Sequence, residues 1–207
     1  MPVKVGDRLE FWARAKPGSS GSEAPITIKA GGKTFFRLAF ATPYYQFYTY
    51  THYREGEIEV EWEDSAIEVS VAYLFNPSTV AQTGVIFIEF RNGEIRAYPR
   101  DRWPAWYAAE RSRAQLHFSP FRGWMNDPNG LCYIDGIYHL FYQFHLNSTD
   151  WGPMHWGHAA SPDLYHWTHL PVFLHPEGNL EALGATGGAF SGTTCIDPTG
   201  KPIIYYT

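Results

Sequence analysis

The chain has 207 residues, a formal net charge of −5, 44% hydrophobic residues, 17% aromatic residues and only 18% charged residues. This composition supports a sizeable buried core and excludes a disordered chain, and the acidic balance without a basic run argues against nucleic acid or a membrane as partner. No apolar stretch approaches the ~18 residues of a membrane-spanning helix, and the N-terminus shows no apolar signal region, so we expect a cytoplasmic protein.

The first hundred residues consist of short apolar or alternating runs separated by turns rich in glycine, proline and asparagine. Strands are expected at residues 26–29, 35–40, 57–62, 67–75 and 85–90. Several strands at this spacing, without a clear helix, are typical of an antiparallel sandwich or jelly roll. We therefore predict an N-terminal β-sandwich accessory domain, with its linker, over residues 1–107.

One segment of this domain is crowded with aromatic residues. Its members are Tyr44, Tyr45, Phe47, Tyr48, Tyr50 and Tyr53. Two interpretations are open. The rings form a platform on which a sugar stacks, or they belong to the sandwich core and to cross-strand pairs.

Residues 98–107 contain two prolines, two tryptophans and three charges. This mixture indicates a linker packed against its neighbours rather than a free tether. Residues 108–116 are expected to form a short helical turn before the second domain begins.

The run Trp-Met-Asn-Asp-Pro-Asn-Gly at residues 124–130 is the most informative segment of the chain. Pro128 biases Asp127 toward an extended conformation, and Asn129 and Gly130 tolerate positive φ. We expect Asp127 to lie in a tight polar turn at the mouth of a sheet, outside any strand. Beyond it, the Asp-Gly pair at 135–136 predicts a hairpin between two apolar strands.

The region that follows mixes aromatic rings with neutral hydrogen-bonding groups. These residues are Gln143, His145, Asn147, Asp150, Trp151, His155, Trp156 and His158. Such a mixture suits a sugar, which offers hydroxyl groups to polar side chains and C–H faces to flat rings.

From about His117 onward the sequence resembles the start of the catalytic domain of glycoside hydrolase family 32, the β-fructosidases that include invertases, levanases and inulinases. The matching motifs are Trp-Met-Asn-Asp-Pro-Asn-Gly at 124–130, Leu-Phe-Tyr-Gln at 140–143, Trp-Gly at 151–152, His-Trp-Gly-His-Ala at 155–159 with Ser161, Asp163, Leu164 and Trp167, and Phe-Ser-Gly at 190–192.

The resemblance implies a retaining hydrolase on a five-bladed β-propeller. It places Asp127 as the nucleophile, and it places Asn126, Gln143, Trp151, Phe190 and Ser191 in the fructose-binding pocket. Residues 108–207 then hold only the first one to two blades of a truncated propeller, because a blade takes about 40 to 50 residues.

The chain departs from the family pattern in one respect. The family's general acid lies in a Glu-Cys motif and its transition-state-stabilising aspartate in an Arg-Asp-Pro motif, and neither motif occurs here. The remaining downstream carboxylates are Asp150, Asp163, Glu177 and Glu181, and we expect none of them to be the general acid. We expect both missing groups to lie beyond Thr207, and the fragment alone to be inactive.

The sequence therefore predicts a glycosidase that cleaves β-fructofuranosidic bonds in a small or polymeric fructoside, without a cofactor. No metal site is expected, because His155 and His158 would point to opposite faces of a strand. Two alternatives stay open: a non-catalytic sugar-binding fragment, and a fructosyltransferase that uses the same covalent intermediate. The choice among sucrose, levan and inulin, and between endo and exo attack, is also open.

Overall fold

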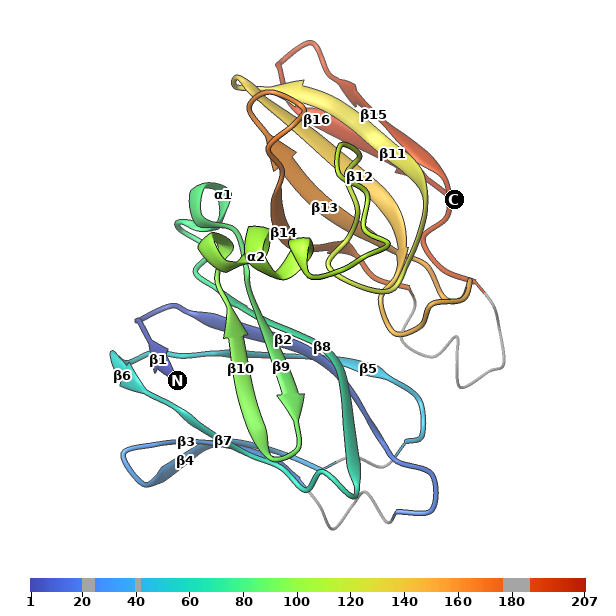
Figure 1. The fold of residues 1–207 in the computed structure, drawn as a ribbon. Helices are drawn as coiled ribbons and strands as arrows, with labels where there is room; N and C mark the ends of the chain where they lie inside the picture. Colours follow the sequence, from blue (N-terminus) through green and yellow to red (C-terminus); the bar gives the residue numbers. More distant parts are fainter. Residues whose placement is uncertain (20–24, 40–41, 177–186) are drawn as a thin grey trace. The chain divides into compact units, whose positions relative to one another are not determined.

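A computed structural model describes residues 1–19, 25–39, 42–176 and 187–207 (Figure 1). The chain divides into two compact units. The first unit comprises Met1–Val80 and Ile86–Pro99, and the second comprises Ala81–Val85 and Arg100–Thr207. Both are built mainly from antiparallel strands, which confirms the predicted all-β class. The assignment of accessory and catalytic roles on either side of residues 107 and 108 stays a prediction.

The first unit is a β-sandwich. Its larger sheet has the strand order β10-β9-β8-β2-β5. The bounds are β2 Arg8–Ala15, β5 Gln46–Thr51, β8 Ile67–Phe75, β9 Ile86–Arg91 and β10 Glu94–Tyr98. A three-stranded sheet of order β4-β3-β7 and the short pair β1-β6 complete the unit. Their bounds are β1 Pro2–Val3, β3 Ile26–Ala30, β4 Lys33–Leu38, β6 Gly56–Glu57 and β7 Glu59–Glu61.

The core of this unit lies between its sheets. Alternate residues of β2, Leu9 and Phe11, pack in one cluster with Ile26 and Ile28 of β3. Because successive strand residues point to opposite faces, this alternation gives each sheet one face in the shared core. The strand expected at 57–62 is divided in two by the buried Ile58.

The aromatic segment of the first unit forms cross-strand pairs. Phe47 lies 4.9 Å from Trp12 between ring centroids, and Tyr48 lies 5.5 Å from Phe11. Both pairs are directly opposite in the β2–β5 ladder. These contacts account for the central rings as packing, whereas Tyr53 is 78% exposed.

The second unit contains a sheet of four sequential antiparallel strands, the arrangement of a propeller blade (Figure 1). The strands are β11 Trp124–Ile134, β12 Ile137–His145, β13 His155–Ser161 and β14 Thr168–Leu174. The predicted Asp-Gly hairpin is confirmed. Asp135 and Gly136 have φ of 49° and 84°, as the tight turn between β11 and β12 requires.

A further hairpin follows the blade, made of β15 Gly192–Ile196 and β16 Pro202–Tyr206. Asp197 closes its turn by accepting hydrogen bonds from the backbone N–H groups of Thr199 and Lys201. Ile204 of this hairpin packs against the cluster of Phe141 and Trp156 on one face of the blade. The hairpin thus lies against the blade as the beginning of another layer.

Three short helical segments occur among the described residues: α1 Val80–Thr83, the 3₁₀ segment η1 Arg100–Arg102 and α2 Trp103–Ala108. Helix α2 begins within the expected linker. Pro104 lies in its first turn, where proline is tolerated because the N–H it lacks would have no partner within the helix. The helical turn expected at 108–116 is wrong beyond Ala108. There the chain is held instead by Arg113, which donates hydrogen bonds to the carbonyls of Pro120 and Phe121. None of the helices in the described residues is long and apolar enough to cross a membrane.

Candidate active site

Asp127 lies at an interruption in the pairing between β11 and β12. The register slips between Met125 and Pro128. Asn126 and Asp127 therefore stand together opposite the single residue Gln143. Two residues facing one define a β-bulge, which bends a strand and re-aims its side chains. Pro128 fits beside the bulge because it has no N–H to donate to a ladder.

The tight turn expected at Asp127 is wrong, since strand β11 runs through this residue. The strand accommodates the polar run by two bulges rather than by ending. The second bulge lies between Asn129 and Cys132, and Gly130 within it has φ of 53°. Of the two residues expected to tolerate positive φ, only Gly130 adopts it.

A chain of hydrogen bonds connects the bulge to the segment before β15. Trp124 Nε1 donates to Asn126 Oδ1 at 3.1 Å, and Asn126 Nδ2 donates to Gln143 Oε1 at 2.5 Å. Gln143 Nε2 then donates to Ser191 Oγ at 3.0 Å, and Ser191 Oγ donates to Asp127 Oδ2 at 3.1 Å. Gln143 is buried, whereas Asp127 and Ser191 are exposed. The result is a solvent-facing carboxylate held by the Ser191 hydroxyl, which the buried Gln143 amide positions in turn.

An aromatic pair flanks this polar group. The rings of Trp151 and Phe190 are nearly parallel, at 15°, with centroids 6.3 Å apart. Trp151 is 46% exposed, so part of a flat apolar face is open to a ligand. Since Phe190 directly precedes Ser191, the apolar face and the hydroxyl belong to one short segment. Polar groups beside flat rings are the arrangement that sugars bind.

The structure brings the six predicted site residues together in two connected groups. Asn126, Asp127, Gln143 and Ser191 are joined by hydrogen bonds, and Trp151 and Phe190 by stacking. The sequence indicated Asn129 only as a turn residue and as part of the 124–130 motif, not as a site residue. Its side-chain Oδ1 accepts a hydrogen bond from the backbone N–H of Gly192 at 3.3 Å.

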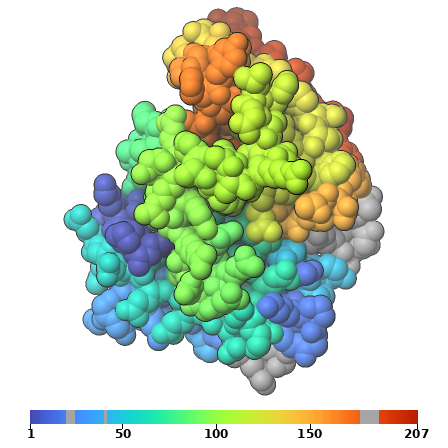
Figure 2. All heavy atoms as spheres, viewed as in Figure 1, coloured from blue at the N-terminus to red at the C-terminus, as the bar shows by residue number. Residues whose placement is uncertain are grey.

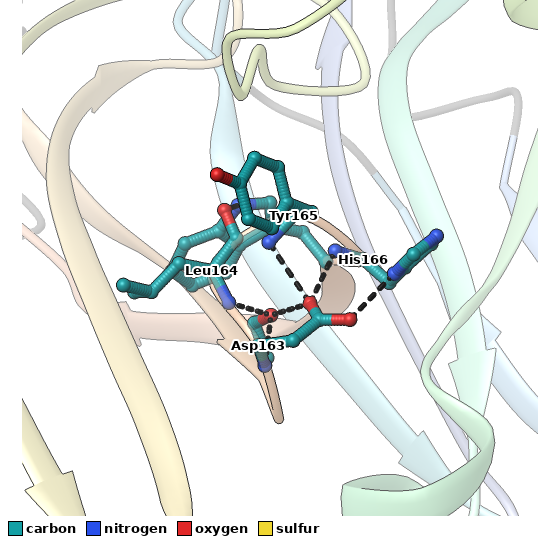
Figure 3. Close-up of polar contacts among 6 residues, drawn as sticks. Asp163, Leu164, Tyr165 and His166 are labelled. Carbon is teal, nitrogen blue, oxygen red and sulfur yellow. Dashed lines mark hydrogen bonds and ion pairs between the residues drawn. The ribbon is translucent and has the colours of Figure 1, made fainter.

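Asp163, one of the remaining carboxylates, caps a turn after β13 (Figure 3). Its Oδ1 accepts the backbone N–H groups of His166 at 2.8 Å and Tyr165 at 2.9 Å, and Oδ2 lies 2.6 Å from His166 Nδ1. The backbone N–H and imidazole of His166, with the N–H of Tyr165, hold the pKa of Asp163 well below its usual range. A general acid must carry a proton before it acts, so Asp163 is unsuited to that role.

Of the other candidate carboxylates, Asp150 is exposed, and its backbone carbonyl is paired with the His145 imidazole at 2.9 Å. Glu177 and Glu181 lie outside the described residues.

Two histidines of the second unit, His155 and His169, are buried, and His158 is partly buried; the neutral form is favoured in all three. Burial lowers the pKa of His155, His158 and His169 to about 3, assisted by His175, His139 and Arg113 respectively. His139 Nδ1 and His158 Nε2 are 3.0 Å apart, so one neutral ring donates to the other. Among the described residues no group of three or more potential ligands surrounds a metal position.

A hollow of about 460 Å³ lies elsewhere in this unit, between residues 100–119 and 165–169. Figure 2 shows these segments in yellow-green and orange on the visible face. Phe118, in its wall, packs on Tyr142 at 5.2 Å between centroids. Tyr142 precedes Gln143 in β12, and neighbouring strand residues point to opposite faces. The hollow is therefore on the other face of the blade from Gln143, and no predicted site residue lines it.

Comparison with known families identifies one domain. The model described as the Glycosyl hydrolases family 32 N-terminal domain matches residues 117–207. Levanase from Bacillus subtilis is 48% identical over 101 residues, which are 49% of this chain and 14% of the levanase. Sucrose-6-phosphate hydrolase from Escherichia coli is 47% identical over 92 residues, which are 44% of this chain and 18% of that protein.

A solved structure resembles nearly the whole chain. A glycoside hydrolase family 32 protein from Bifidobacterium adolescentis aligns with a TM-score of 0.75 and 32% identity. The alignment covers 98% of this chain and 32% of that protein, so it includes both units. The chain spans less than a fifth of the two curated relatives described above.

Proposed function

Residues 117–207 of this chain are the N-terminal part of a glycosyl hydrolase family 32 domain, and from this premise we propose that the protein hydrolyses β-fructofuranosidic bonds. Relatives named levanase and sucrose-6-phosphate hydrolase support this class of substrate. The observation that carries the proposal is Asp127, an exposed carboxylate in a bulge, bound to Ser191 beside the Trp151–Phe190 pair.

In this proposal Asp127 is the nucleophile of a retaining hydrolase. Its carboxylate attacks the anomeric carbon of the fructosyl unit, and the bond to the leaving oxygen breaks as a second carboxylic acid protonates that oxygen. Water, deprotonated by the same second group, then cleaves the fructosyl ester and frees Asp127. The hydrogen bond from Ser191 Oγ fixes the attacking carboxylate before substrate arrives, which reduces the entropy cost of the reaction.

The surrounding residues supply the fructose pocket. Asn126 and Ser191 offer polar atoms next to the nucleophile, and Gln143 orients both. The exposed face of Trp151, backed by Phe190, receives the C–H face of the sugar. We propose that the general acid and the transition-state-stabilising aspartate come from parts of a longer protein, because neither of their motifs occurs in these 207 residues.

The test uses the full-length protein and measures fructose release from sucrose, levan and inulin. Reactions in aqueous methanol add a stereochemical readout, because a retaining enzyme with a covalent intermediate yields methyl β-fructofuranoside. We expect that product from the wild type and none from Asp127→Ala. An unchanged rate in Asp127→Ala would contradict the nucleophile assignment.

The same reactions separate the alternatives. Transfer of fructose to a second sugar in preference to water would identify a fructosyltransferase. Sugar binding without any turnover by the full-length protein would identify a binding module. The substrate that gives the highest kcat/KM selects among sucrose, levan and inulin.

A further inference from the structure

Two site residues lie on a segment that belongs to neither strand of the nucleophile's hairpin. Phe190 and Ser191 directly precede β15, and β15 pairs with β16 rather than with β11. Backbone contacts hold the chain at the start of this segment: Gly188 forms a bridge with Met154, the Ala189 N–H donates to the Met154 carbonyl at 2.8 Å, and the Phe190 N–H donates to the Thr207 carbonyl at 2.7 Å. Two side chains from the blade add contacts to residues 190–192 themselves.

The first contact comes from Asn129 in β11. This side chain is 3% exposed, and its Oδ1 accepts the backbone N–H of Gly192 at 3.3 Å. Its Nδ2 is buried and has no hydrogen-bond partner among the described residues. A buried amide that leaves its own donor unsatisfied is costly. The hydrogen bond to Gly192 offsets part of the free-energy cost of burying the Asn129 amide.

The second contact comes from Trp156 in β13. Its side chain is fully buried, and Nε1 donates to the backbone carbonyl of Phe190 at 2.9 Å. The 190–192 segment lies directly on the indole, since a Cβ added at Gly192 would come within 2.8 Å of Trp156 and 2.2 Å of the Tyr205 carbonyl. Glycine alone permits this approach.

We propose that Asn129 and Trp156 are positioning residues that clamp the two ends of the 190–192 segment, so that Ser191 Oγ reaches both Asp127 and Gln143. Asn129 fixes the end at Gly192, and Trp156 fixes the end at Phe190. The side-chain hydrogen bonds of both residues go to the segment rather than to Asp127, so both act through the segment. The effect on turnover rests on the proposed function, whereas the placement of residues 190–192 by Asn129 and Trp156 does not depend on it.

The kinetic test uses Asn129→Leu, Asn129→Asp and Trp156→Phe in the full-length protein. Leucine has a similar shape but no acceptor, aspartate keeps an acceptor oxygen, and phenylalanine lacks the indole N–H. We expect kcat/KM on the best fructoside to fall at least tenfold in Asn129→Leu and Trp156→Phe. Asn129→Asp should recover most of the loss at its own pH optimum. Unfolding midpoints are measured for every variant.

A matched control is Trp62→Phe, which removes an indole N–H whose partner, Asp64 Oδ1, lies 3.4 Å away on the surface of the first unit. This change should leave kcat/KM within twofold of wild type. Retention of kcat/KM within twofold in both Asn129→Leu and Trp156→Phe would overturn the inference. So would an Asn129→Asp variant as impaired as Asn129→Leu, because the acceptor oxygen would then be irrelevant.

Amide hydrogen exchange tests the clamp without any activity. In Asn129→Leu the exchange of the Gly192 amide should rise at least tenfold, while the amides of β12 keep the wild-type rates. Unchanged protection at Gly192 would overturn the clamp. Faster exchange at Gly192 in a protein that releases no fructose would support the clamp and refute the proposed function.

Discussion

The two units each contain a β-bulge with a polar residue, and the two bulges differ in what surrounds them. In the first unit the register between β2 and β8 slips between Trp12 and Ala13, and Ser70 is the extra residue of β8. Ser70 is buried, and its hydroxyl lies 3.5 Å from the carbonyl of Trp12. That polar group is satisfied within its own sheet.

In the second unit the bulge at Asn126 and Asp127 exposes the Asp127 side chain, which accepts a hydrogen bond from Ser191 in the segment directly before β15. A bulge therefore redirects a side chain but does not by itself create a site. A site requires that a second element, here the 190–192 segment, meets the redirected group.

Removal of the Asp127 carboxylate should have the greatest effect on turnover. Asp127→Asn in the full-length protein should lower kcat by roughly 10³-fold or more, because an amide is not a nucleophile. The unfolding midpoint should stay near that of wild type, since Asp127 is exposed. The matched variant is Ser70→Ala in the other bulge, which should leave kcat unchanged. A similar loss of kcat in both variants would mean that bulge geometry rather than the carboxylate matters.

The second expected effect is a difference between the units in their response to acid. His155, His158 and His169 have folded-state pKa values of about 3, below the ordinary value near 6.5. Between about pH 3 and pH 6.5 these histidines are protonated in the unfolded chain but neutral in the folded one. The free energy of unfolding of the second unit therefore falls as the pH drops from about 6.5. The slope is roughly 1.4 kcal/mol per pH unit for each buried imidazole.

The first unit buries a carboxyl group instead. Burial raises the pKa of Glu10, although the Tyr73 hydroxyl and Arg8 act in the opposite direction. Here the folded state binds more protons, so stability is lost as the pH rises through the raised pKa. Amide exchange in β8 and β13 at pH 7 and pH 5, corrected for intrinsic rates, should therefore show greater acid sensitivity in β13. Equal sensitivity would contradict the prediction, and His117→Asn, at an exposed site, serves as the control.

A third prediction concerns the second bulge of β11. Gly130 has φ of 53°, and an added Cβ would lie 2.7 Å from Thr194 Oγ1 and 3.1 Å from the Phe141 ring. Gly130→Ala should lower the free energy of unfolding by roughly 2 to 4 kcal/mol, from backbone strain and crowding together. Gly93→Ala, also at positive φ but with open space around it, should cost about 1 to 2 kcal/mol. Equal losses in denaturant titrations would show that crowding contributes nothing.

Loss of the exposed Trp151 ring should reduce turnover much less than loss of Asp127. Trp151→Ala in the full-length protein should lower kcat/KM about tenfold, since a stacking surface contributes roughly 1 to 2 kcal/mol. Asn126→Ala should likewise weaken the site less than loss of Asp127. Tyr165→Ala, another exposed ring of the second unit, should leave kcat/KM unchanged. If Trp151→Ala matched that control, Trp151 would not contact the sugar.

Local patterns in the sequence predicted part of the first unit: β3, β4, β8 and β9 were expected, whereas β2, β5 and β10 were not. The strand 67–75 was predicted from β-branched and aromatic residues, and the Asp-Gly turn at 135–136 from backbone preference. The six site residues came from motifs of a known family. Their roles in catalysis stay predictions, although their proximity is visible in the hydrogen bonds and stacking of the second unit.

The bulge at Asp127 was not predictable, because residues such as Asp-Pro-Asn-Gly favour a turn and are also tolerated in an interrupted strand. Only the pairing of β11 with β12 decides between the two. The role inferred for Asn129 could not be predicted either, because it too depends on a contact between distant parts of the sequence. Its partner Gly192 is 63 residues away in the sequence, and no local pattern reports such a contact.

The hydrogen bonds at the site have a consequence that follows from their polarity. Every donor from Trp124 to Ser191 points the same way, and the last bond ends on Asp127. Gln143→Glu would exchange a donor for an acceptor of nearly the same shape. Ser191 would then turn its single proton toward the new carboxylate and release Asp127. The orientation of the Asp127 carboxylate therefore depends on the direction of the Gln143 amide, which reaches it only through Ser191.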